Sequence, residues 1–481
     1  MSLSSPHSEL SVIKDLARKR RLAIYLVGGF LRDRFLGREV KDFDFAVSKD
    51  AVKFARAFAK AVKGAFVLLD AEAGCARVVK KQGRVIWTFD FADFRAPTLK
   101  GDLTKRDFSI NTLAVDFLTW PLEDCERPFK ISNDTLGSKY AKRDLKAGVI
   151  RMVSASAFVD DPLRLLRAYS LRAQLGFAIE PKTLTRIKKD KALIRKVSPE
   201  RVREELFKIF DSPCTAETLK AMDAVRLLTT VIPQLEVMRG VKQGGYHHLD
   251  VWKHSLAAVA ELEKIIKSMQ ADPDIAAYLD AEIAGGHSRR SILKFACLLH
   301  DIGKPDTKKK EPSGRTSFHG HEHIGRRIAR IVAKHLMLST KERYAIEDIV
   351  TLHLRPGYLS NFKRPSEKAI YRFMREAKDE AVSVLLLSTA DQHATRGPLT
   401  TAYDIRHHER IAFPLINAYF AKKKEKPFVR LINGHDLIKE LRLKPGPQFS
   451  EILRLVDEAQ HLGKIATRAE ALVLAEKLAK K

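Results

Sequence analysis

Two aspartates, Asp42 and Asp44, stand two residues apart in the segment DFDF and are the strongest candidates for chemistry in this sequence. Alternate side chains of a β-strand share a face, so both carboxylates point one way while Phe43 and Phe45 enter the core. Paired carboxylates repel each other unless a cation lies between them, and a divalent metal ion is the usual partner. The pattern therefore predicts a metal site on one face of a strand.

A glycine pair lies just before these aspartates. The apolar run at 24–27 predicts a short buried strand that stops at Gly28 and Gly29, and a helical turn carrying Arg32 and Asp33 follows. Glycines let the backbone approach a phosphate closely, and a helix N-terminus favours anions. An ordinary strand–helix–strand unit with a polar edge is the alternative. The glycine and aspartate signals together favour a nucleotide and metal site.

Later strands of this α/β region offer further candidates. Asp90, between two phenylalanines, is either a third metal-site carboxylate or a polar residue of an edge strand. In the segment 101–117, Arg106 is a candidate phosphate or ribose ligand. We expect Asp107 and Asn111 to orient it.

From residue 149 the pattern becomes helical, and a helix beginning at Asp160 or Asp161 presents charged residues at three-residue spacing. Asp161, Arg164 and Arg167 would share one face of this helix. An ion pair on a solvated face is one interpretation. The other is base recognition, in which a carboxylate accepts from the exocyclic amine of C or A while a guanidinium donates to a ring nitrogen. Further helices are expected at 200–210, 216–228 and 252–269.

Composition limits the class of protein. A chain of 481 residues is too long for one core, and its formal charge of +28 favours a polyanionic partner such as RNA or DNA. The 4 cysteines are scattered without CxxC pairs, which suits a reducing cytoplasm. No apolar run approaches membrane length, so we expect no membrane association.

A second group of metal-type residues follows in the helical region. His300 and Asp301 come directly after the apolar run FACLL and before Gly-Lys, where burying the pair without a partner would be costly. Imidazole and carboxylate together are ligands for first-row divalent metals. The predicted ligands are His254, His300, Asp301, His321, His353 and Asp391. Nearby alternates are His247, His248, His319, His323 and His393.

Several motifs occur in an order that resembles a known family. GGFLRD with DFDF, KRDFSINTLA, DDPLRLLRAYSLRAQLGF and ERVREELFKIF are similar to the signatures of class II tRNA nucleotidyltransferases and bacterial poly(A) polymerases. The later histidine and aspartate pattern resembles the HD phosphohydrolase domain that some bacterial members carry. The segment starting LINGHDLIKELRLKPGP is similar to their tail.

The resemblance implies an architecture of four parts. It implies an α/β nucleotidyltransferase head, with a mixed sheet and helices, followed by an all-α neck, an HD-domain body and a helical tail. The expected bounds are 1–150 for the head, 151–230 for the neck that recognises the base and binds RNA, 231–415 for the HD domain and 416–481 for the tail, which would contact RNA.

The resemblance also implies roles for residues. Asp42 and Asp44 would hold two Mg²⁺ ions with Asp90 as a further catalytic carboxylate, while the HD ligands would bind a divalent metal of unknown identity. Gly29, Arg32 and Arg106 would hold the triphosphate. Asp161 and Arg164 would read the base, backed by Arg167. The full expected nucleotide-binding set is Gly28, Gly29, Arg32, Asp33, Arg106, Asp107, Asn111, Asp161, Arg164 and Arg167.

The expected activity is template-independent addition of C and/or A from CTP and ATP to the 3′ end of tRNA, with an additional HD phosphohydrolase activity. Only the short stretch 96–101 separates the Asp90 strand region from Asp102, where many CCA-adding relatives have a longer loop. This favours CC addition. Asp160 replaces a usual Glu, and Ser170 replaces a further Arg of many members. Poly(A) polymerase, an enzyme acting mainly through its HD domain, and a non-catalytic RNA-binding protein are the alternatives. No protein partner is predicted.

Overall fold

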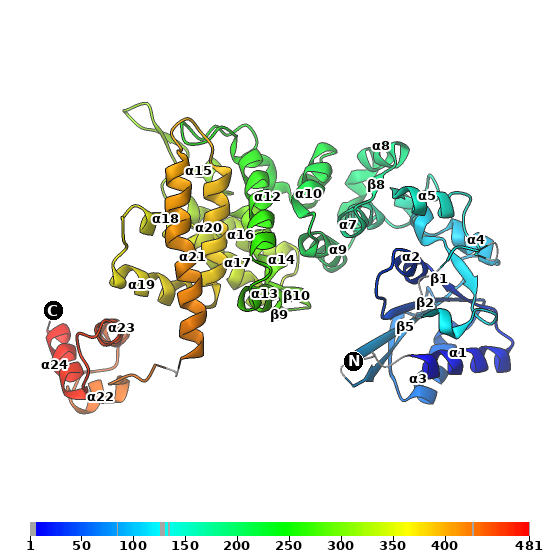
Figure 1. Ribbon diagram of the computed structural model, residues 1–481, viewed down its shortest axis with the longest axis horizontal. Helices are drawn as coiled ribbons and strands as arrows, with labels where there is room; N and C mark the ends of the chain where they lie inside the picture. The colour runs from blue at the N-terminus through cyan, green and yellow to red at the C-terminus, as the bar shows by residue number, and fades with distance from the viewer. Residues whose placement is uncertain (1–5, 84, 126–129, 133–134, 426–427, 481) are drawn as a thin grey trace. The chain divides into compact units, whose positions relative to one another are not determined.

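The computed structural model describes residues 6–83, 85–125, 130–132, 135–425 and 428–480. The chain divides into two compact units (Figure 1). One comprises residues 1–214 and 221–231, and the other comprises residues 215–220 and 232–481. Among the described helices, none combines the length and apolar character needed to cross a bilayer.

A six-stranded mixed sheet forms the centre of the first unit. Its strand order is β3-β4-β5-β2-β1-β6, in which β2 and β5 are parallel and the other neighbours are antiparallel. The mixed α/β head expected from the sequence is therefore confirmed. The strands are β1 Ile24–Val27, β2 Asp42–Val47, β3 Ala65–Asp70, β4 Cys75–Gln82, β5 Val85–Asp93 and β6 Ala114–Asp116.

Phenylalanines from β2 and β5 cover one face of this sheet. Phe43 stacks on Phe89 at 5.3 Å between ring centroids, and Phe45 stacks on Phe91 at 5.2 Å. The helix α3 (Ala51–Val62) adds Phe54 and Phe58, whose rings lie 5.2 Å from those of Phe91 and Phe89. Because side chains alternate along a strand, these buried rings direct the carboxylates of the same strands to the opposite face.

Helices complete the first unit. The helices α1 and α3 pack together beside the sheet (Figure 1). A short parallel pair, β7 Val149–Ile150 and β8 Ala178–Ile179, flanks the two helices at 157–160 and 164–175 in the chain. The helices are α1 His7–Arg20, α2 Gly29–Phe35, α3, α4 Leu99–Thr104, α5 Ala141–Ala147, α6 Ala157–Asp160, α7 Arg164–Leu175, α8 Pro181–Asp190, α9 Pro199–Asp211 and α11 Leu227–Val231, with α10 Thr215–Ala224 divided between the units.

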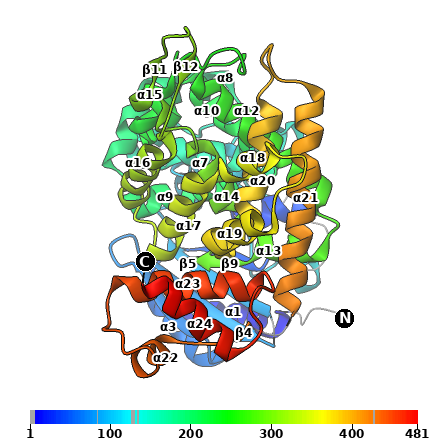
Figure 2. The ribbon, with the colours of Figure 1, turned by 90° about the vertical axis from the view of Figure 1, so that its left-hand side faces the viewer.

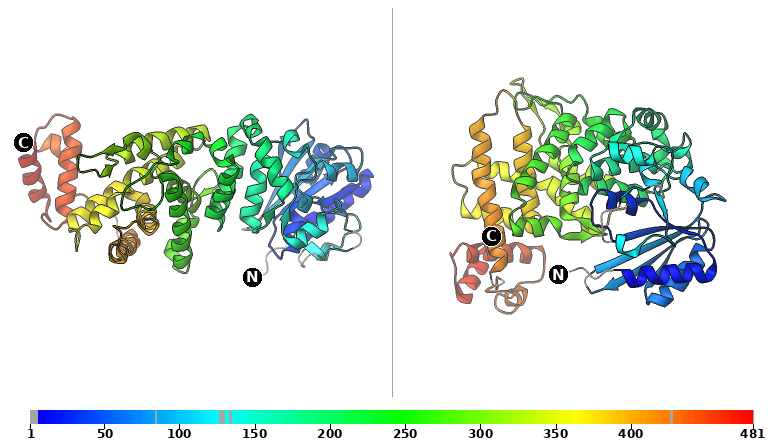
Figure 3. Two further views of the ribbon diagram at one scale, coloured as in Figure 1. Left: turned by 90° about the horizontal axis from the view of Figure 1, so that it is seen from above. Right: turned by 45° about the vertical axis from the view of Figure 1, so that its right-hand side comes forward.

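The second unit is mainly helical. Its helix α12 packs against α14 and α20, and α20 runs beside the long α21 (Figures 2 and 3). The tail helices α22 to α24 enclose a small core of their own that includes Ile432, Leu437 and Val456. The helices are α12 Val251–Met269, α13 Pro273–Asp280, α14 Arg289–Leu299, α15 Lys304–Thr307, α16 His321–His335, α17 Thr340–Leu352, α18 Arg355–Ser360, α19 Glu367–Ala377, α20 Ala381–Ala394, α21 Ala402–Lys424, α22 Gly434–Lys439, α23 Pro447–His461 and α24 Arg468–Ala479.

Three details differ from the sequence prediction. The region after residue 149 contains short strands, including the hairpins β9 Glu282–Ala284 with β10 His287–Ser288 and β11 Lys309–Lys310 with β12 Thr316–Ser317. The single helix expected at 216–228 is broken, because Arg226 adopts a left-handed backbone with φ of 61°. The helix expected to begin at Asp160 or Asp161 begins at Arg164, after the separate short helix α6.

The phenylalanine core predicts a measurable stability difference between two positions of β5. Replacing Phe89, which is fully buried, by alanine should cost about 3–5 kcal/mol of head stability because a cavity remains. Urea unfolding would be followed by fluorescence of Trp87 and Trp120 in a Trp252→Phe background. The control Ile86→Ala, at a side chain 52% exposed, should change stability by less than about 0.5 kcal/mol. Equal losses for the two variants would contradict this account of the core.

Candidate functional site

A cavity of about 300 Å³ in the first unit gathers most of the residues expected to bind nucleotide. Asp42, Arg32 and Asp33 are not among the residues that line it. The predicted residues that line it are Gly28, Gly29, Asp44, Asp90, Arg106, Asp107, Asn111, Asp161, Arg164 and Arg167.

The carboxylates lie on the face of the sheet opposite the phenylalanines. Asp44 is directly beside Asp90 in the parallel register of β2 and β5, whereas Asp42 is at the exposed start of β2. Burial and the neighbouring Asp90 raise the pKa of Asp44 to about 6 despite the opposing charges of Arg106 and Arg167. Asp90 forms two hydrogen bonds of 2.8 Å with Arg77. A metal cation would stabilise the ionised forms of two neighbouring carboxylates, so Asp44 and Asp90 fit such an ion.

The glycine turn brings the backbone close to these charged groups. Gly28 has φ of +73°, and a Cβ atom there would be 3.2 Å from Arg106 Nη1 and 3.6 Å from Asp44 Oδ2. A Cβ at Gly29 would be 3.5 Å from the same Asp44 oxygen. Glycine is thus favoured at residue 28 by its positive φ and by the close approach of Arg106, whereas a Cβ at residue 29 would make only ordinary van der Waals contacts.

A hydrogen-bond network connects three elements behind the cavity. Arg32 of α2 donates to Asn111 Oδ1 at 2.5 Å, and Asn111 Nδ2 donates to both Asp107 oxygens at 3.1 Å. Arg167 of α7 donates to Asp107 Oδ2 at 2.5 Å, and the Phe108 amide donates to Oδ1 at 2.8 Å. Burial alone would raise the pKa of Asp107, but Arg167 and these N–H donors lower it to about 2.

The two residues expected to read the base both have partners within the protein. Asp161 precedes α7 and accepts from Arg201 of α9 at 3.1 and 3.2 Å. Arg164 is the first residue of α7, and its guanidinium donates to the carbonyls of Lys105, Arg106 and Ala157 at 2.8–3.3 Å. These contacts fix both groups at the wall of the cavity.

Three arginines near this cavity were not predicted. Arg95 and Arg201 line it, and Arg77 pairs with Asp90 from β4. Arg201 lies in the ERVREE segment, which resembles a family motif, so that resemblance could have identified it as a site residue. Arg77 faces Asp90 through antiparallel register, which a single sequence does not give. Arg95 follows β5 in an ordinary-looking loop, so nothing in its sequence context marked it.

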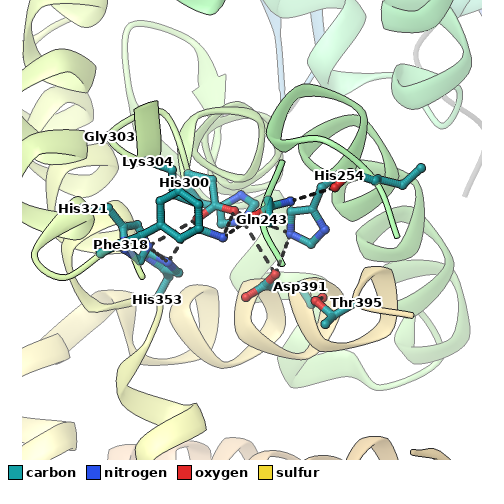
Figure 4. Close-up of polar contacts among 12 residues, drawn as sticks. Gln243, His254, His300, Gly303, Lys304, Phe318, His321, His353, Asp391 and Thr395 are labelled. Atoms are coloured by element: carbon teal, nitrogen blue, oxygen red, sulfur yellow. Dashed lines mark hydrogen bonds and ion pairs between the residues drawn. The ribbon is translucent and has the colours of Figure 1, made fainter. Parts of the chain in front are cut away.

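The predicted HD ligands converge in the second unit (Figure 4). His254 Nε2 is 2.8 Å from Asp391 Oδ1, and His300 Nε2 is 3.3 Å from Asp301 Oδ2. On the other side of Asp301, His321 Nε2 is 3.3 Å from Oδ1 and also 3.3 Å from His353 Nε2. Asp301 therefore belongs to two groups of residues that could each hold a metal ion, one with His254 and His300 and one with His321 and His353.

Local hydrogen bonds orient three of these imidazoles. The Nδ1 atoms of His300, His321 and His353 lie 2.7, 2.8 and 2.6 Å from the carbonyl oxygens of Cys297, Phe318 and Val350, each three residues earlier. Carbonyls only accept, so each Nδ1 carries the proton and donates it. That tautomer leaves Nε2 available as a ligand, the usual arrangement at metal sites.

The electrostatics of this cluster also fit a divalent cation. His300 Nε2 is buried and makes no ordinary hydrogen bond within the described part of the chain, and its nearest carboxylate oxygen is Asp301 Oδ2 at 3.3 Å. Asp301 and Asp391 raise the pKa of His300 to about 10 against the effect of burial, so their field favours positive charge at Nε2. Lys304 Nζ lies 2.6 Å from Asp301 Oδ2.

A cavity of about 660 Å³ adjoins the cluster, and Lys304, Arg315 and His321 are among its lining residues. Two alternates, His247 and His319, also line this cavity. His393 instead lies 3.0 Å from Glu409, and His323 is exposed. His247 and His319 therefore lie in the cavity next to the predicted ligands, whereas His393 pairs with Glu409 and His323 is exposed.

Four family models match the chain. The "Poly A polymerase head domain" matches residues 24–130, the "Probable RNA and SrmB- binding site of polymerase A" residues 176–238 and the "HD domain" residues 251–396. The model described as "tRNA nucleotidyltransferase domain 2 putative" matches residues 426–475. The A-adding tRNA nucleotidyltransferase of Deinococcus radiodurans is 32% identical over 94% of this chain and 95% of its own. The chain belongs to the tRNA nucleotidyltransferase family.

A further relative supports membership of this family. The CC-adding tRNA nucleotidyltransferase of Thermus thermophilus is 30% identical over 92% of this chain and 91% of its own. Two solved structures share the fold at 20% identity. A CCA-adding enzyme complexed with ATP has a TM-score of 0.63, covering 98% of this chain and 95% of its own. The Thermotoga maritima CCA-adding enzyme complexed with tRNA has a TM-score of 0.60, covering 98% and 94%.

The network around Asp107 predicts a pH-dependent contribution to stability in this tRNA nucleotidyltransferase. The pKa of Asp107 is lower in the folded protein than its ordinary value of 3.8, so its ionised form favours the folded state. Asp107→Asn should therefore reduce the free energy of unfolding by about 2 kcal/mol at pH 7.

The difference between wild type and Asp107→Asn should shrink to about half at pH 3 and vanish below pH 2, because Asp107 becomes protonated in the unfolded chain first. Urea unfolding of both proteins at pH 7, 4 and 3 would measure it. The control Asp15→Asn removes a carboxylate whose side chain is 72% exposed and should leave stability nearly unchanged. A difference that grows on acidification would contradict the role of Asp107.

Proposed function

We propose that this chain adds C and/or A to the 3′ end of tRNA without a nucleic-acid template. The proposal rests on one observation above all, the cavity in which Asp44, the Gly28–Gly29 turn and several arginines come together. Its near full-length relatives named A-adding and CC-adding tRNA nucleotidyltransferases support the same activity. The formal charge of +28 suits a polyanionic RNA partner.

The reaction transfers a nucleotidyl group. The oxygen of the RNA 3′-hydroxyl loses its proton to solvent and bonds to the α-phosphorus of CTP or ATP. The bond between the α-phosphorus and the oxygen bridging to the β-phosphate breaks, and pyrophosphate leaves. Asp42 and Asp44 would hold two Mg²⁺ ions, with Asp90 beside them, and bound Mg²⁺ would activate the hydroxyl and neutralise charge on the pyrophosphate. Gly28 and Gly29 let the backbone approach the triphosphate closely.

The arginines of the cavity would contact the triphosphate, and Asp161 and Arg164 would contact the base. Arg106, which Asp102 holds, would face the triphosphate from the cavity wall. Asn111 and Asp107 instead hydrogen-bond to Arg32 and Arg167, and among the described residues neither side chain bonds to Arg106, contrary to the expectation that they orient it. Asp161 would accept a hydrogen bond from the exocyclic amine of C or A, and Arg164 would donate to the adjacent ring nitrogen. Uracil would place its O4 acceptor against Asp161, which would leave a repulsive contact in the cavity.

We also propose the four-part division of the chain at residues 150, 230 and 415, and a cytoplasmic location. All four cysteines are free, which suits a reducing compartment. The short stretch 96–101 is the reason to prefer CC addition.

Incubation with tRNA lacking its 3′ CCA, Mg²⁺ and each labelled nucleotide tests the transfer activity. Wild-type protein should incorporate CTP, ATP or both, and Asp42→Ala or Asp44→Ala should lower incorporation by about 10³-fold or more, because each removes a ligand from the transfer centre. The control Asp15→Ala removes an exposed carboxylate of the same unit and should keep full activity.

The products distinguish the remaining possibilities. Incorporation of CTP alone would establish CC addition, ATP alone on tRNA ending in CC would establish A addition, and long A tails on unrelated RNA would indicate poly(A) polymerase. Absence of CTP and ATP incorporation by wild-type protein would refute the proposal.

The cluster in the second unit favours a second function, which we propose to be metal-dependent phosphohydrolysis of 2′,3′-cyclic phosphates or nucleotides. The supporting observation is the buried histidine and aspartate cluster beside a cavity lined by Lys304 and Arg315. A divalent metal bound there would lower the pKa of a water molecule and polarise the phosphoryl group. Lys304 and Arg315 would offer positive charge to the phosphate.

Separate variants should divide the two activities, because the two centres share no residue. The double variant His300→Ala, Asp301→Ala should lose metal-dependent hydrolysis of 2′,3′-cyclic AMP and keep nucleotide incorporation. Asp44→Ala should show the reverse. The control His335→Ala, at an exposed position on α16, should keep both. Hydrolysis that survives intact in the double variant would exclude this function for the cluster.

A further inference from the structure

The cavity of the first unit contains a guanidinium whose charge has no partner. Among the described residues, five arginines line this cavity, and four of them have acceptors within the protein. Arg106 pairs with Asp102 at 3.0 Å, Arg167 with Asp107 at 2.5 Å and Arg201 with Asp161 at 3.1 Å. The guanidinium of Arg164 donates to three backbone carbonyls. The guanidinium of Arg95, the fifth, forms no hydrogen bond or ion pair in the described part of the chain.

The backbone around Arg95 is nevertheless firmly held. The amide of Phe94 donates to the carbonyl of Val47 at 2.9 Å, which ties the end of β5 to the end of β2. The amide of Arg95 donates to Asp102 Oδ1 at 3.2 Å, while Oδ2 of the same carboxylate accepts from Arg106 Nε at 3.0 Å. Asp102 is only 1% exposed. One buried carboxylate therefore fixes both the backbone of Arg95 and the side chain of Arg106.

Electrostatics around Arg95 indicate an excess of positive charge. Arg95 lines the cavity and is exposed to solvent. Desolvation by the nearby protein and the charge of Arg106 lower the pKa of Arg95, and Asp102 and Asp107 oppose this effect without cancelling it. Arg164 adds to the repulsion. An anion that entered the cavity would relieve this repulsion.

Asp44 is a negatively charged counterpart of Arg95 in the same cavity. Its carboxylate lines the same cavity and has no ion pair or hydrogen bond among the described residues. The cavity thus offers one unpaired carboxylate and one unpaired guanidinium. A phosphate group that arrives with a divalent cation satisfies both at once.

We propose that Arg95 binds a phosphate group of a substrate in this cavity. The proposal rests on the transfer reaction proposed above. Two substrates carry such a group, the triphosphate of the incoming nucleotide and the terminal phosphodiester of the tRNA. A guanidinium presents a planar set of donors to phosphate oxygens, whereas an ammonium presents a point charge, so arginine and lysine should differ at this position.

The experiment compares Arg95→Ala, Arg95→Lys and wild type as full-length proteins with Mg²⁺. The KM for CTP and ATP is measured at saturating tRNA lacking its 3′ CCA, and the Kd for the same tRNA is measured by fluorescence polarisation. We expect Arg95→Ala to raise the nucleotide KM about tenfold or more, with the tRNA Kd changed less than about twofold. Arg95→Lys should recover part of the loss.

Inorganic tripolyphosphate serves as a probe without a base. Its inhibition constant should be higher for Arg95→Ala than for wild type, by a factor similar to the rise in the nucleotide KM. The control Arg20→Ala removes an equal charge from α1, where the side chain donates to the carbonyl of Lys53 at 3.2 Å, and should change neither constant.

The outcomes separate the two sources and the underlying function. A rise in tRNA Kd with an unchanged nucleotide KM would support a phosphate contact from the tRNA instead. Unchanged values for both substrates would overturn the proposal for Arg95. Inactive wild-type protein would refute the transfer function itself. In that case direct binding of tripolyphosphate would be measured, and a higher Kd for Arg95→Ala than for wild type would still support the phosphate site.

Discussion

The ion pair between Asp107 and Arg167 is the constraint on which the first cavity depends. Asp107 stands in the loop before a short 3-10 turn, and Arg167 stands on α7, so the pair joins the sheet-based part of the unit to its helical part. Asn111 extends the connection to Arg32 behind the glycine turn. The elements that would hold a triphosphate and those that would read a base are therefore aligned through one buried carboxylate. Asp107 thereby fixes the two halves of the cavity relative to each other.

The two candidate centres are built in different ways. In the first unit, the position of the carboxylates follows from sheet register, since Phe43, Phe45, Phe89 and Phe91 occupy one face and leave the other to Asp44 and Asp90. In the second unit, the ligands come from helix ends and helix interiors that are far apart in sequence and meet around Asp301. The first centre is partly open and rich in arginine, which suits a large anionic substrate. The second is buried and rich in histidine, which suits a tightly held metal.

Much of this could be predicted from the sequence, because the informative patterns are local. The period-two alternation in DFDF identified the strand and the face of its carboxylates, and the spacing of Arg164 and Arg167 identified the side of α7 that meets the cavity. Asp161, which was expected on the same helix, lies before it in extended backbone and still lines the cavity. The histidine and aspartate residues that converge around Asp301 could be proposed as metal ligands for a similar reason, since burying His300 and Asp301 directly after an apolar run is costly without a partner. What could not be predicted depends on contacts distant in sequence. The pairing of Asp90 with Arg77, of Asp161 with Arg201 and of Asp102 with the Arg95 amide requires the register and packing of separate elements. The break at Arg226 depends on a backbone conformation that residue type alone does not indicate.

The Nδ1 hydrogen bonds of His300, His321 and His353 have a consequence for the thermodynamics of metal uptake. Each acceptor carbonyl lies three residues earlier in the same local segment, so the orientation of each imidazole is set by short-range structure and not by the ion. Little side-chain entropy then remains to be lost when a cation enters, and little of the binding free energy is spent on ordering the ligands. The second unit should accordingly keep its fold when a chelator removes the metal, in contrast to small domains whose folding is driven by their ion.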